Sequence, residues 1–171
     1  MARVVTFDLT TDGITHAISE INRFKGDFLR ACQEALRILA AEKGVKFATQ
    51  RISYYLAQRP SSPYVRTGRL ENSMRGYYDS GKGMGILYSN CWYAVFVEYG
   101  TGVVGAANPH PQPWSYDVND HGTDGWYYIE SGGKPHWTMG QPSAPFFYDT
   151  KQELKRIAPQ VYRELFRTEL G

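Results

Sequence analysis

Apolar residues recur at intervals of three and four over most of the first 56 positions of the chain. They are Ile14, Ala17, Ile18, Ile21, Phe24, Phe28, Cys32, Ala35, Leu36, Leu39 and Ala40, followed by Val45, Ala48, Ile52, Tyr55 and Leu56. Because residues three and four apart share one face of a helix, this spacing predicts a long amphipathic helix or a kinked pair. We expect Thr11 or Asp12 to cap it, Gly44 to weaken it and Pro60 to close it. A helix beyond about 25 residues suggests a spine that packs on neighbouring molecules.

The same spacing returns near the end of the chain, at Leu154, Ile157, Ala158, Val161 and Leu165. It predicts a C-terminal helix capped by Asp149 or Thr150. Pro159 falls inside this helix and removes one backbone donor, so we expect a kink there.

Two stretches between the helices have the pattern of β-hairpins. Residues 75–78 and 85–89 flank a glycine-rich turn, and residues 125–130 and 135–139 flank a second turn. The glycines of the first turn also suggest a phosphate-binding loop. Such a loop needs a helix behind it, whereas β-branched and aromatic residues follow here, so a hairpin turn is the better interpretation. Residues 3–9 are predicted to form a short strand or a docking arm.

Residues 103–143 lose the helical spacing and are dominated by Gly, Pro, Trp, Tyr and His. An excursion of about 40 residues exceeds the usual connector and is generally functional or disordered. Its aromatic and proline content favours an interface with a neighbouring subunit or another partner. The candidate contact residues are Trp114, Tyr116, Trp126, Tyr127 and Trp137.

Together these elements predict an α+β fold in a single domain of residues 1–171. A long N-terminal helix and a C-terminal helix pack on a small, mainly antiparallel sheet. Residues 103–143 form an inserted loop or hairpin. A length of 171 residues fits one domain.

Composition favours a globular protein. Apolar residues make up 42% of the chain and charged residues 21%, and no run of 18 apolar residues occurs, so we expect no membrane-spanning segment. The N-terminus lacks the basic-then-apolar pattern of a signal peptide, which predicts folding in the cytoplasm of the producing cell. Cys32 and Cys91 lie far apart, and Cys32 falls in the helical stripe, which predicts a core thiol rather than a disulfide.

The net charge of +2 conceals a segregation along the chain. Residues 1–75 carry 12 Lys and Arg against 7 Asp and Glu, residues 76–150 carry 2 against 7, and residues 151–171 carry 5 against 3. An acidic middle between basic flanks is typical of complementary faces on neighbouring subunits. No block of like charge is dense enough to indicate nucleic acid as the main partner.

The densest apolar and aromatic run lies at residues 92–102 and contains one carboxylate, Glu98, the only acid between Asp79 and Asp117. Burying a carboxylate unpaired costs several kcal/mol. Glu98 is therefore expected to have a cationic or hydrogen-bonding partner, or to lie at an edge in water. Burial statistics favour the simpler alternative, a core segment with a solvated glutamate.

Three groups of residues suggest catalytic or metal chemistry, and each lacks a required part. Cys91-Trp92 resembles the Cys-Trp of papain-type proteases, but the preceding Cys-Gly-Ser is absent, which favours a buried strand cysteine. Glu98 has no second titratable residue near it in sequence to serve general-base catalysis. Six possible metal ligands lack the compact spacing of a zinc or calcium site: His110, His121, His136, Asp117, Asp120 and Asp124. No catalytic, cofactor or metal site is therefore predicted.

A series of short motifs occurs in a recognisable order between residues 67 and 146. It consists of Thr67-Gly68-Arg69-Leu70 with Ser73, the first hairpin, Tyr93-Ala94, Val97-Glu98-Tyr99-Gly100-Thr101-Gly102, and finally Ala144-Pro145-Phe146. This order resembles the neck (head–tail joining, or minor tail) protein family of long-tailed bacteriophages and related prophages. The resemblance covers residues 67–102 and 144–168, and the N-terminal helix more loosely. The aromatic stretch at 103–143 departs from it.

The resemblance implies a small, non-enzymatic α+β subunit that assembles as a ring between the portal-side connector and the tail and lines the path of DNA. The implied partners are further copies of the chain, the portal or connector protein on the head side, and the tail-tube or tail-terminator protein on the tail side. DNA is passing cargo, no membrane is involved, and the implied location is the head–tail junction of the virion.

Two structural expectations concern the motif residues themselves. Thr67 before Arg69 and Leu70 suggests the cap of a short helical turn, although the local pattern favours an ordinary connector. Glu98 is expected to make a fixed polar contact with Arg69 or another basic residue of the 67–70 segment.

Other functions stay open. A tail-terminator or tail-completion subunit fits the same motifs. A small hydrolase that uses Cys91 with one of the histidines is a different class, and a free-standing ligand-binding module is a third.

Overall fold

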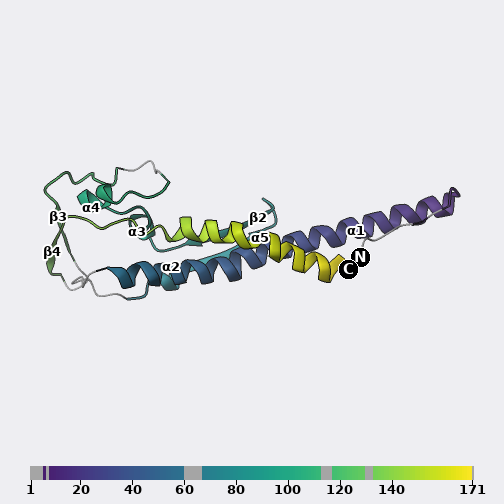
Figure 1. Ribbon diagram of the computed structural model, residues 1–171, viewed down its shortest axis with the longest axis horizontal. Coiled ribbons are helices and arrows are strands. Elements are labelled where there is room, and N and C mark those ends of the chain that lie inside the picture. Colours follow the sequence, from purple (N-terminus) through teal and green to yellow (C-terminus); the bar gives the residue numbers. More distant parts are fainter. Residues whose placement is uncertain (1–5, 7, 60–66, 113–116, 130–132, 171) are drawn as a thin grey trace.

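The computed structural model describes residues 6, 8–59, 67–112, 117–129 and 133–170 and has an α+β fold. Figure 1 shows an elongated molecule with one helical rod along most of its length. Most of the shorter elements lie near one end, and one hairpin reaches the middle. The predicted fold class, with long N- and C-terminal helices and antiparallel strands, is confirmed. In the described residues, however, the strands form two separate two-stranded sheets rather than one.

The rod consists of three helical segments that follow one another without a break. They are α1 (Thr11–Arg37), the π-helical segment η1 (Ile38–Gly44) and α2 (Val45–Gln58). The prediction of one long helix that continues past Gly44 and ends before Pro60 is thereby confirmed. The predicted cap is wrong: Thr10 accepts the backbone N–H of Gly13 at 3.1 Å, so Thr11 and Asp12 lie in the first turn.

The first hairpin packs flat against the π-helical segment. β1 (Met74–Asp79) pairs antiparallel with β2 (Met84–Ser89), and the Asp79 side chain accepts two backbone N–H groups of the turn. Gly76 permits the close approach, because a Cβ at this position would clash with the backbone carbonyl of Ala40. The predicted hairpin is confirmed, and its turn leads into a strand rather than into a phosphate-binding helix.

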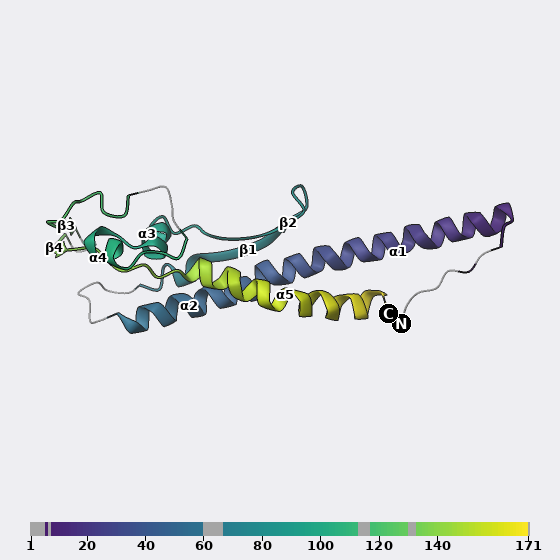
Figure 2. The same cartoon turned by 45° about the horizontal axis from the view of Figure 1, so that its top comes forward.

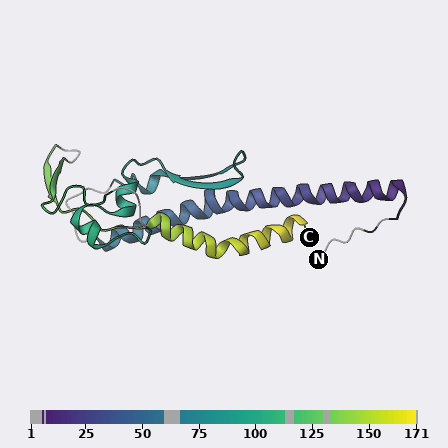
Figure 3. The same cartoon turned by 90° about the horizontal axis from the view of Figure 1, so that it is seen from above.

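α5 (Phe146–Leu170) runs back along the rod, antiparallel to α1 (Figure 2). The predicted cap is again wrong, because Asp149 lies within the first turn and the Thr150 hydroxyl donates to the Phe146 carbonyl at 2.6 Å. Pro159 lies inside the helix, as predicted, and α5 is bowed along its length (Figure 3). The first half of α1 projects beyond the end of α5 (Figures 2 and 3).

The central run is helical rather than extended. It forms α3 (Ala94–Tyr99), in which Ala94, Val97 and Glu98 are buried because their spacing of three and four places them on one face. Cys91 lies between β2 and α3, so its interpretation as a strand residue is wrong. The main core consists of Ala48, Ile52, Leu70, Met74, Cys91, Ala94, Val97, Ala144 and Phe146.

A single 3₁₀ turn, η2 (Glu71–Ser73), precedes β1. The alternative in which Thr67 caps this turn is wrong. The Thr67 hydroxyl accepts the N–H of Arg69 at 3.4 Å, whereas the residue at the N-cap position of the turn is Leu70. The N–H of Asn72 donates to the carbonyl of Gly68 at 2.9 Å.

Residues 103–143 contain more regular structure than a loop. α4 (Gly102–Ala107) continues from α3, and β3 (Trp126–Ile129) pairs antiparallel with β4 (Pro135–Thr138), which confirms the second hairpin. Residues 3–9 lie largely outside the described part of the chain, and their described members belong to no strand. None of the described helices has the length and apolar character needed to cross a membrane.

Candidate functional site

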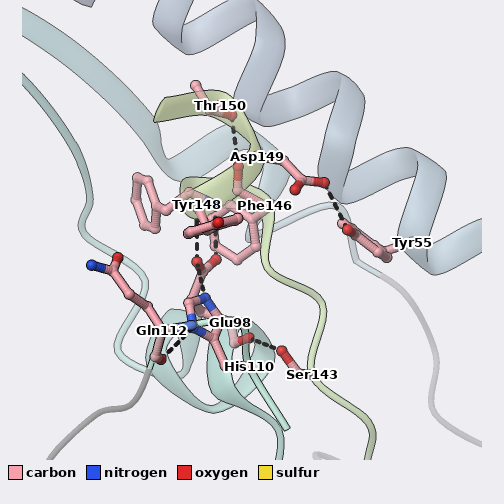
Figure 4. A network of polar contacts seen from close by, with 10 residues as sticks. Tyr55, Glu98, His110, Gln112, Ser143, Phe146, Tyr148, Asp149 and Thr150 are labelled. Carbon is pink, nitrogen blue, oxygen red and sulfur yellow. Dashed lines mark hydrogen bonds and ion pairs between the residues drawn. The ribbon is translucent and has the colours of Figure 1, made fainter. Parts of the chain in front are cut away.

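Glu98 extends from α3 so that its carboxylate meets the first turn of α5 (Figure 4). Oε2 accepts the backbone N–H of Phe147 at 2.8 Å, and Oε1 accepts that of Tyr148 at 3.0 Å. N–H groups in the first turn of a helix have no partner within the helix. Pro145, which precedes α5, has no side-chain acceptor. Glu98 therefore caps α5 from a part of the chain almost 50 residues away.

His110 completes the site from the loop after α4. Its Nε2 lies 3.0 Å from Oε1 of Glu98, and the two side chains are only 4% and 5% exposed. Its Nδ1 faces the backbone of Gln112, 2.9 Å from the amide nitrogen and 2.5 Å from the carbonyl oxygen. A proton on Nε2 donates to Oε1 of Glu98, and the backbone of Gln112 holds the other ring nitrogen in place. The His110 ring packs against Tyr99 and Tyr148, with centroid distances of 4.2 and 5.6 Å.

Burial dominates the electrostatics of this pair. Loss of hydration raises the pKa of the Glu98 carboxyl, and the N–H groups of Phe147 and Tyr148 and the His110 side chain lower it by less. The positive end of the α5 dipole faces the same carboxylate. Both carboxylate oxygens are engaged within the protein, which suits a structural cap better than a general base that must meet a substrate.

The glycine-rich end of α3 docks on the segment that leads into α5. Gly100 has φ 81° and ψ 176°, a conformation essentially restricted to glycine, and a Cβ there would lie 2.8 Å from the backbone nitrogen of Ser143. Thr101 forms an antiparallel bridge with Gln141 through N–H to carbonyl distances of 2.9 and 3.0 Å. The Ser143 hydroxyl donates to the Glu98 carbonyl at 2.6 Å. These contacts fix the path of the chain into the first turn of α5.

Side chains from the end of the rod reach the same segment. Arg59 donates from Nη1 to Oε1 of Gln141 at 2.6 Å, and the Gln141 amide donates to the Phe96 carbonyl at 3.0 Å. The Tyr55 hydroxyl donates to Oδ2 of Asp149 at 2.7 Å. α2, α3 and α5 are therefore joined by polar contacts around the core.

The structure brings together most of the residues singled out in the sequence. Those in the core or packed at its edge are Leu70, Tyr93, Ala94 and Phe146. The motif residues in the polar and ring contacts beside the core are Glu98, Tyr99, Gly100, Thr101 and Gly102, and Pro145 lies just before α5. Thr67 and Arg69 are exposed, with Gly68 between them at φ 69°. The predicted contact between Glu98 and Arg69 is wrong, because His110 and two backbone N–H groups occupy the carboxylate.

His110 is the site residue that sequence reasoning missed. The sequence places it among possible metal ligands, 12 residues from Glu98 and in a separate segment. One signal for it exists: Pro109 and Pro111 flank the histidine, and such flanking prolines restrict the backbone that carries the ring. No group of three or more His, Cys, Asp or Glu able to hold a metal ion occurs in the described part of the chain.

Cys91 is a core side chain with 5% exposure, and its thiol is free. The three histidine rings named with it contact other residues: His110 meets Glu98, His121 stacks on Trp126 at 4.0 Å, and His136 stacks on Tyr128 at 5.6 Å.

The second hairpin presents an apolar face, here called the hairpin patch and consisting of Tyr127, Ile129, Pro135 and Trp137. Tyr127 and Ile129 are each 68% exposed, Trp137 is 52% exposed, and Tyr127 packs edge-on against Trp137 at 5.0 Å. Trp126 lies on the opposite face and is half-buried. Of the predicted contact residues, Tyr127 and Trp137 thus lie on one surface, whereas Trp114 and Tyr116 lie outside the described residues.

Comparisons with protein-family models, curated proteins and solved structures found no match to this chain.

Proposed function

We propose that this chain is a structural virion protein of the phage head–tail junction. In this proposal it is a neck subunit that assembles as a ring between the portal-side connector and the tail and lines the path of DNA, with no catalysis. The observation that carries the proposal is the meeting of the family-like motifs in one place. Leu70, residues 93–102 and residues 144–146 come from three parts of the chain and pack around the start of α5.

The Glu98 contacts give the motif order a physical reason. A carboxylate in an apolar run is costly unless it has donors, and here it caps the helix that Ala144-Pro145-Phe146 opens. The glycines at 100 and 102 let the following chain approach residues 139–143 closely. The resemblance thereby extends from the order of short motifs to one three-dimensional unit, which supports a neck-like subunit.

Exposed apolar surfaces support an assembly with other molecules. The hairpin patch lies near one end of the elongated molecule, and the projecting half of α1, which carries exposed Ile and Phe side chains, lies at the other (Figure 1). Contiguous apolar patches on a protein surface generally mark interaction sites. In the proposed ring, copies of the chain, the connector and the tail protein cover them.

Charge supports contacts between subunits as well. Asp117, Asp120 and Asp124 are exposed just before β3, where the negative charge of the middle third gathers. The first 75 residues are basic overall. Faces of opposite sign steer neighbouring subunits together and suppress wrong pairings.

The test is a nonsense allele of this gene in a phage that encodes the chain, followed by electron microscopy of the lysate. Finished heads and finished tails that stay unjoined, and that join when wild-type chain is supplied, support the neck function. Tails of abnormal length identify a tail-terminator instead. Normal infectious particles that lack the polypeptide overturn both.

A further inference from the structure

The first half of α1 carries apolar side chains that no described helix covers. Ile14, Ile18, Ile21 and Phe24 are 42%, 55%, 58% and 40% exposed, and we call these four residues the α1 stripe. All four lie in the first half of α1, and that half projects past the end of α5 (Figures 2 and 3). An exposed apolar surface on a projecting helix is removed from water only when a partner covers it.

The spacing along this part of α1 is that of a coiled coil. One series of apolar residues recurs every seven positions, and a second series follows it three residues later. The members in chain order are Ile14, Ala17, Ile21, Phe24, Phe28 and Ala31. A strict seven-residue repeat keeps one seam facing a partner helix when the two supercoil.

The molecule already covers the second part of this seam with its own helix. Phe28 stacks on Phe166 of α5 at a centroid distance of 5.0 Å, and Ala31 and Ala35 are 0% exposed. The seam is therefore a packing surface from Phe28 onward. In its N-terminal part the larger seam residues Ile14, Ile21 and Phe24 are exposed, whereas Ala17 between them is only 4% exposed.

We propose that the α1 stripe binds the α1 stripe of a second copy of this chain as a parallel coiled coil. Charges beside the seam select this occupant and this direction. Glu20 lies on one side of the seam and Lys25 on the other, spaced so that in a parallel pair each Glu20 faces the Lys25 of the second copy. In an antiparallel pair the two Glu20 side chains face one another, which is unfavourable for like charges.

This inference rests on the proposed function, since it names one contact within the proposed assembly. A pair in which the same stripe of two copies meets is two-fold symmetric, so it joins two subunits. The ring is then closed by a second, heterologous contact. The covered stretch is only about two heptads long, so we expect a weak, concentration-dependent association in solution.

Disulfide trapping tests the contact on the full chain. In a Cys32→Ala background, Ile21→Cys places a thiol in the seam, and Ser19→Cys places one on the opposite, exposed face as a matched control. Equivalent seam positions of a parallel pair lie close enough for a disulfide. Under mild oxidation we expect cross-linked dimer from Ile21→Cys at least tenfold faster than from Ser19→Cys. Equal rates overturn the contact.

Two further arms test direction and charge. Ile14→Cys cross-links mainly with itself in a parallel pair; preferential cross-linking with Phe24→Cys chains overturns the parallel arrangement. Lys25→Glu and Glu20→Lys each weaken self-association in sedimentation velocity, and an equimolar mixture of the two variants restores it. A mixture that stays as weak as either variant overturns the charge pairing.

The outcomes separate this contact from the proposed function. If Ile21→Asp still gives normal rings or joined particles and Ile21→Cys gives no cross-links, the α1 contact is overturned. The neck function then still stands. If particles are complete without the chain, the neck function is overturned. The cross-linking of the purified chain then decides by itself whether the α1 contact forms. Side chains of the α1 stripe are exposed, so these variants are expected to fold, which far-ultraviolet circular dichroism checks.

Discussion

Glu98 is a buried carboxylate whose environment is built from groups far away in the sequence. Its oxygens meet two helix N–H groups of α5 and the His110 ring, and the side chain is 5% exposed. Three donors offset part of the loss of hydration, and the pKa of the carboxyl still lies above its ordinary value because burial is the larger effect. The residue therefore links the stability of the fold to pH.

The first prediction concerns that pH dependence. Because the folded form of Glu98 has a pKa raised above its ordinary 4.5, the stabilisation it contributes is complete below pH 4.5 and is lost as pH rises through the folded-state pKa. Urea unfolding between about pH 4 and pH 7 should show this decline in the free energy of unfolding. Glu98→Gln, which cannot titrate, should show a smaller decline. An equal or larger decline in the variant contradicts the assignment.

The second prediction concerns the partners of Glu98. Glu98→Ala leaves the Phe147 and Tyr148 N–H groups and the His110 ring without their acceptor and should cost about 3 kcal/mol of unfolding free energy. In a double-mutant cycle, Glu98→Ala and His110→Ala should couple by about 1–2 kcal/mol. Arg69→Ala is the control and should be additive with Glu98→Ala within about 0.5 kcal/mol. Strong coupling to Arg69 would restore the contact that the geometry excludes.

The third prediction concerns Cys91. With 5% exposure in the core, its thiol should react with a disulfide reagent only when the protein unfolds, because attack requires an accessible thiolate. Thiol titration of a Cys32→Ser variant isolates this residue. Rapid reaction of the folded protein at neutral pH would revive the hydrolase alternative.

At the scale of elements, the start of α5 depends on the turn that ends α3. Gly100 turns the chain so that Thr101 pairs with Gln141, and the Ser143 hydroxyl closes back on the Glu98 carbonyl. A helix whose cap comes from another element loses that cap whenever the two elements separate. α3 and the first turn of α5 should accordingly order and melt together.

Gly100→Ala tests this junction. The φ and ψ of Gly100 exclude a side chain, and the added Cβ would also meet the Ser143 nitrogen at 2.8 Å and the Gln141 oxygen at 2.9 Å. We expect a loss of about 2–4 kcal/mol in urea unfolding. Gly83→Ala is the matched control, because Gly83 has φ 64° with nothing within 4 Å and should cost only about 1 kcal/mol. Equal losses would mean that backbone strain alone, without the contact, accounts for Gly100.

At the scale of the whole molecule, the two ends have different chemistry. One end carries the hairpin patch beside exposed aspartates, and the other carries the α1 stripe on a projecting helix (Figure 1). The core and the Glu98 contacts lie between the projecting tip of α1 and the hairpin patch. Surface variants at either end can therefore separate assembly from folding.

The hairpin patch provides that separation. Tyr127→Lys combined with Trp137→Glu keeps an attractive pair at these two opposite positions. It should change the free energy of unfolding by less than about 1 kcal/mol, since both side chains are more than half exposed. The same variant should fail to restore joined particles in the complementation assay. Thr123→Asp, exposed and outside the patch, should restore them. Full complementation by the double variant would show that the patch is not a contact surface.

Deletion of residues 106–140 is a poorer test, because it also removes His110.

The elements that sequence reasoning predicted well are those whose signals are local. The long helix and α5 follow from apolar residues spaced by three and four, and both hairpins follow from β-forming runs around glycine turns. The predicted caps were wrong at both helices. Thr10, one residue before the predicted pair, caps α1, and Glu98, almost 50 residues away in the sequence, caps α5. The sequence analysis assigned no type to the central run, since a six-residue apolar segment fits a strand or a helix equally well.

The sequence by itself determined the α+β class, the positions of the long helices and hairpins, and the expectation that Glu98 needs a partner if buried. Only the tertiary structure decided that the partners of Glu98 are His110 and the first turn of α5. It also decided that residues 94–99 are helical and that α5 is capped by another element. The reason is physical: periodicity acts through neighbours along one helix or strand, whereas the Glu98–His110 pair and the α5 cap exist only after separate segments have packed together.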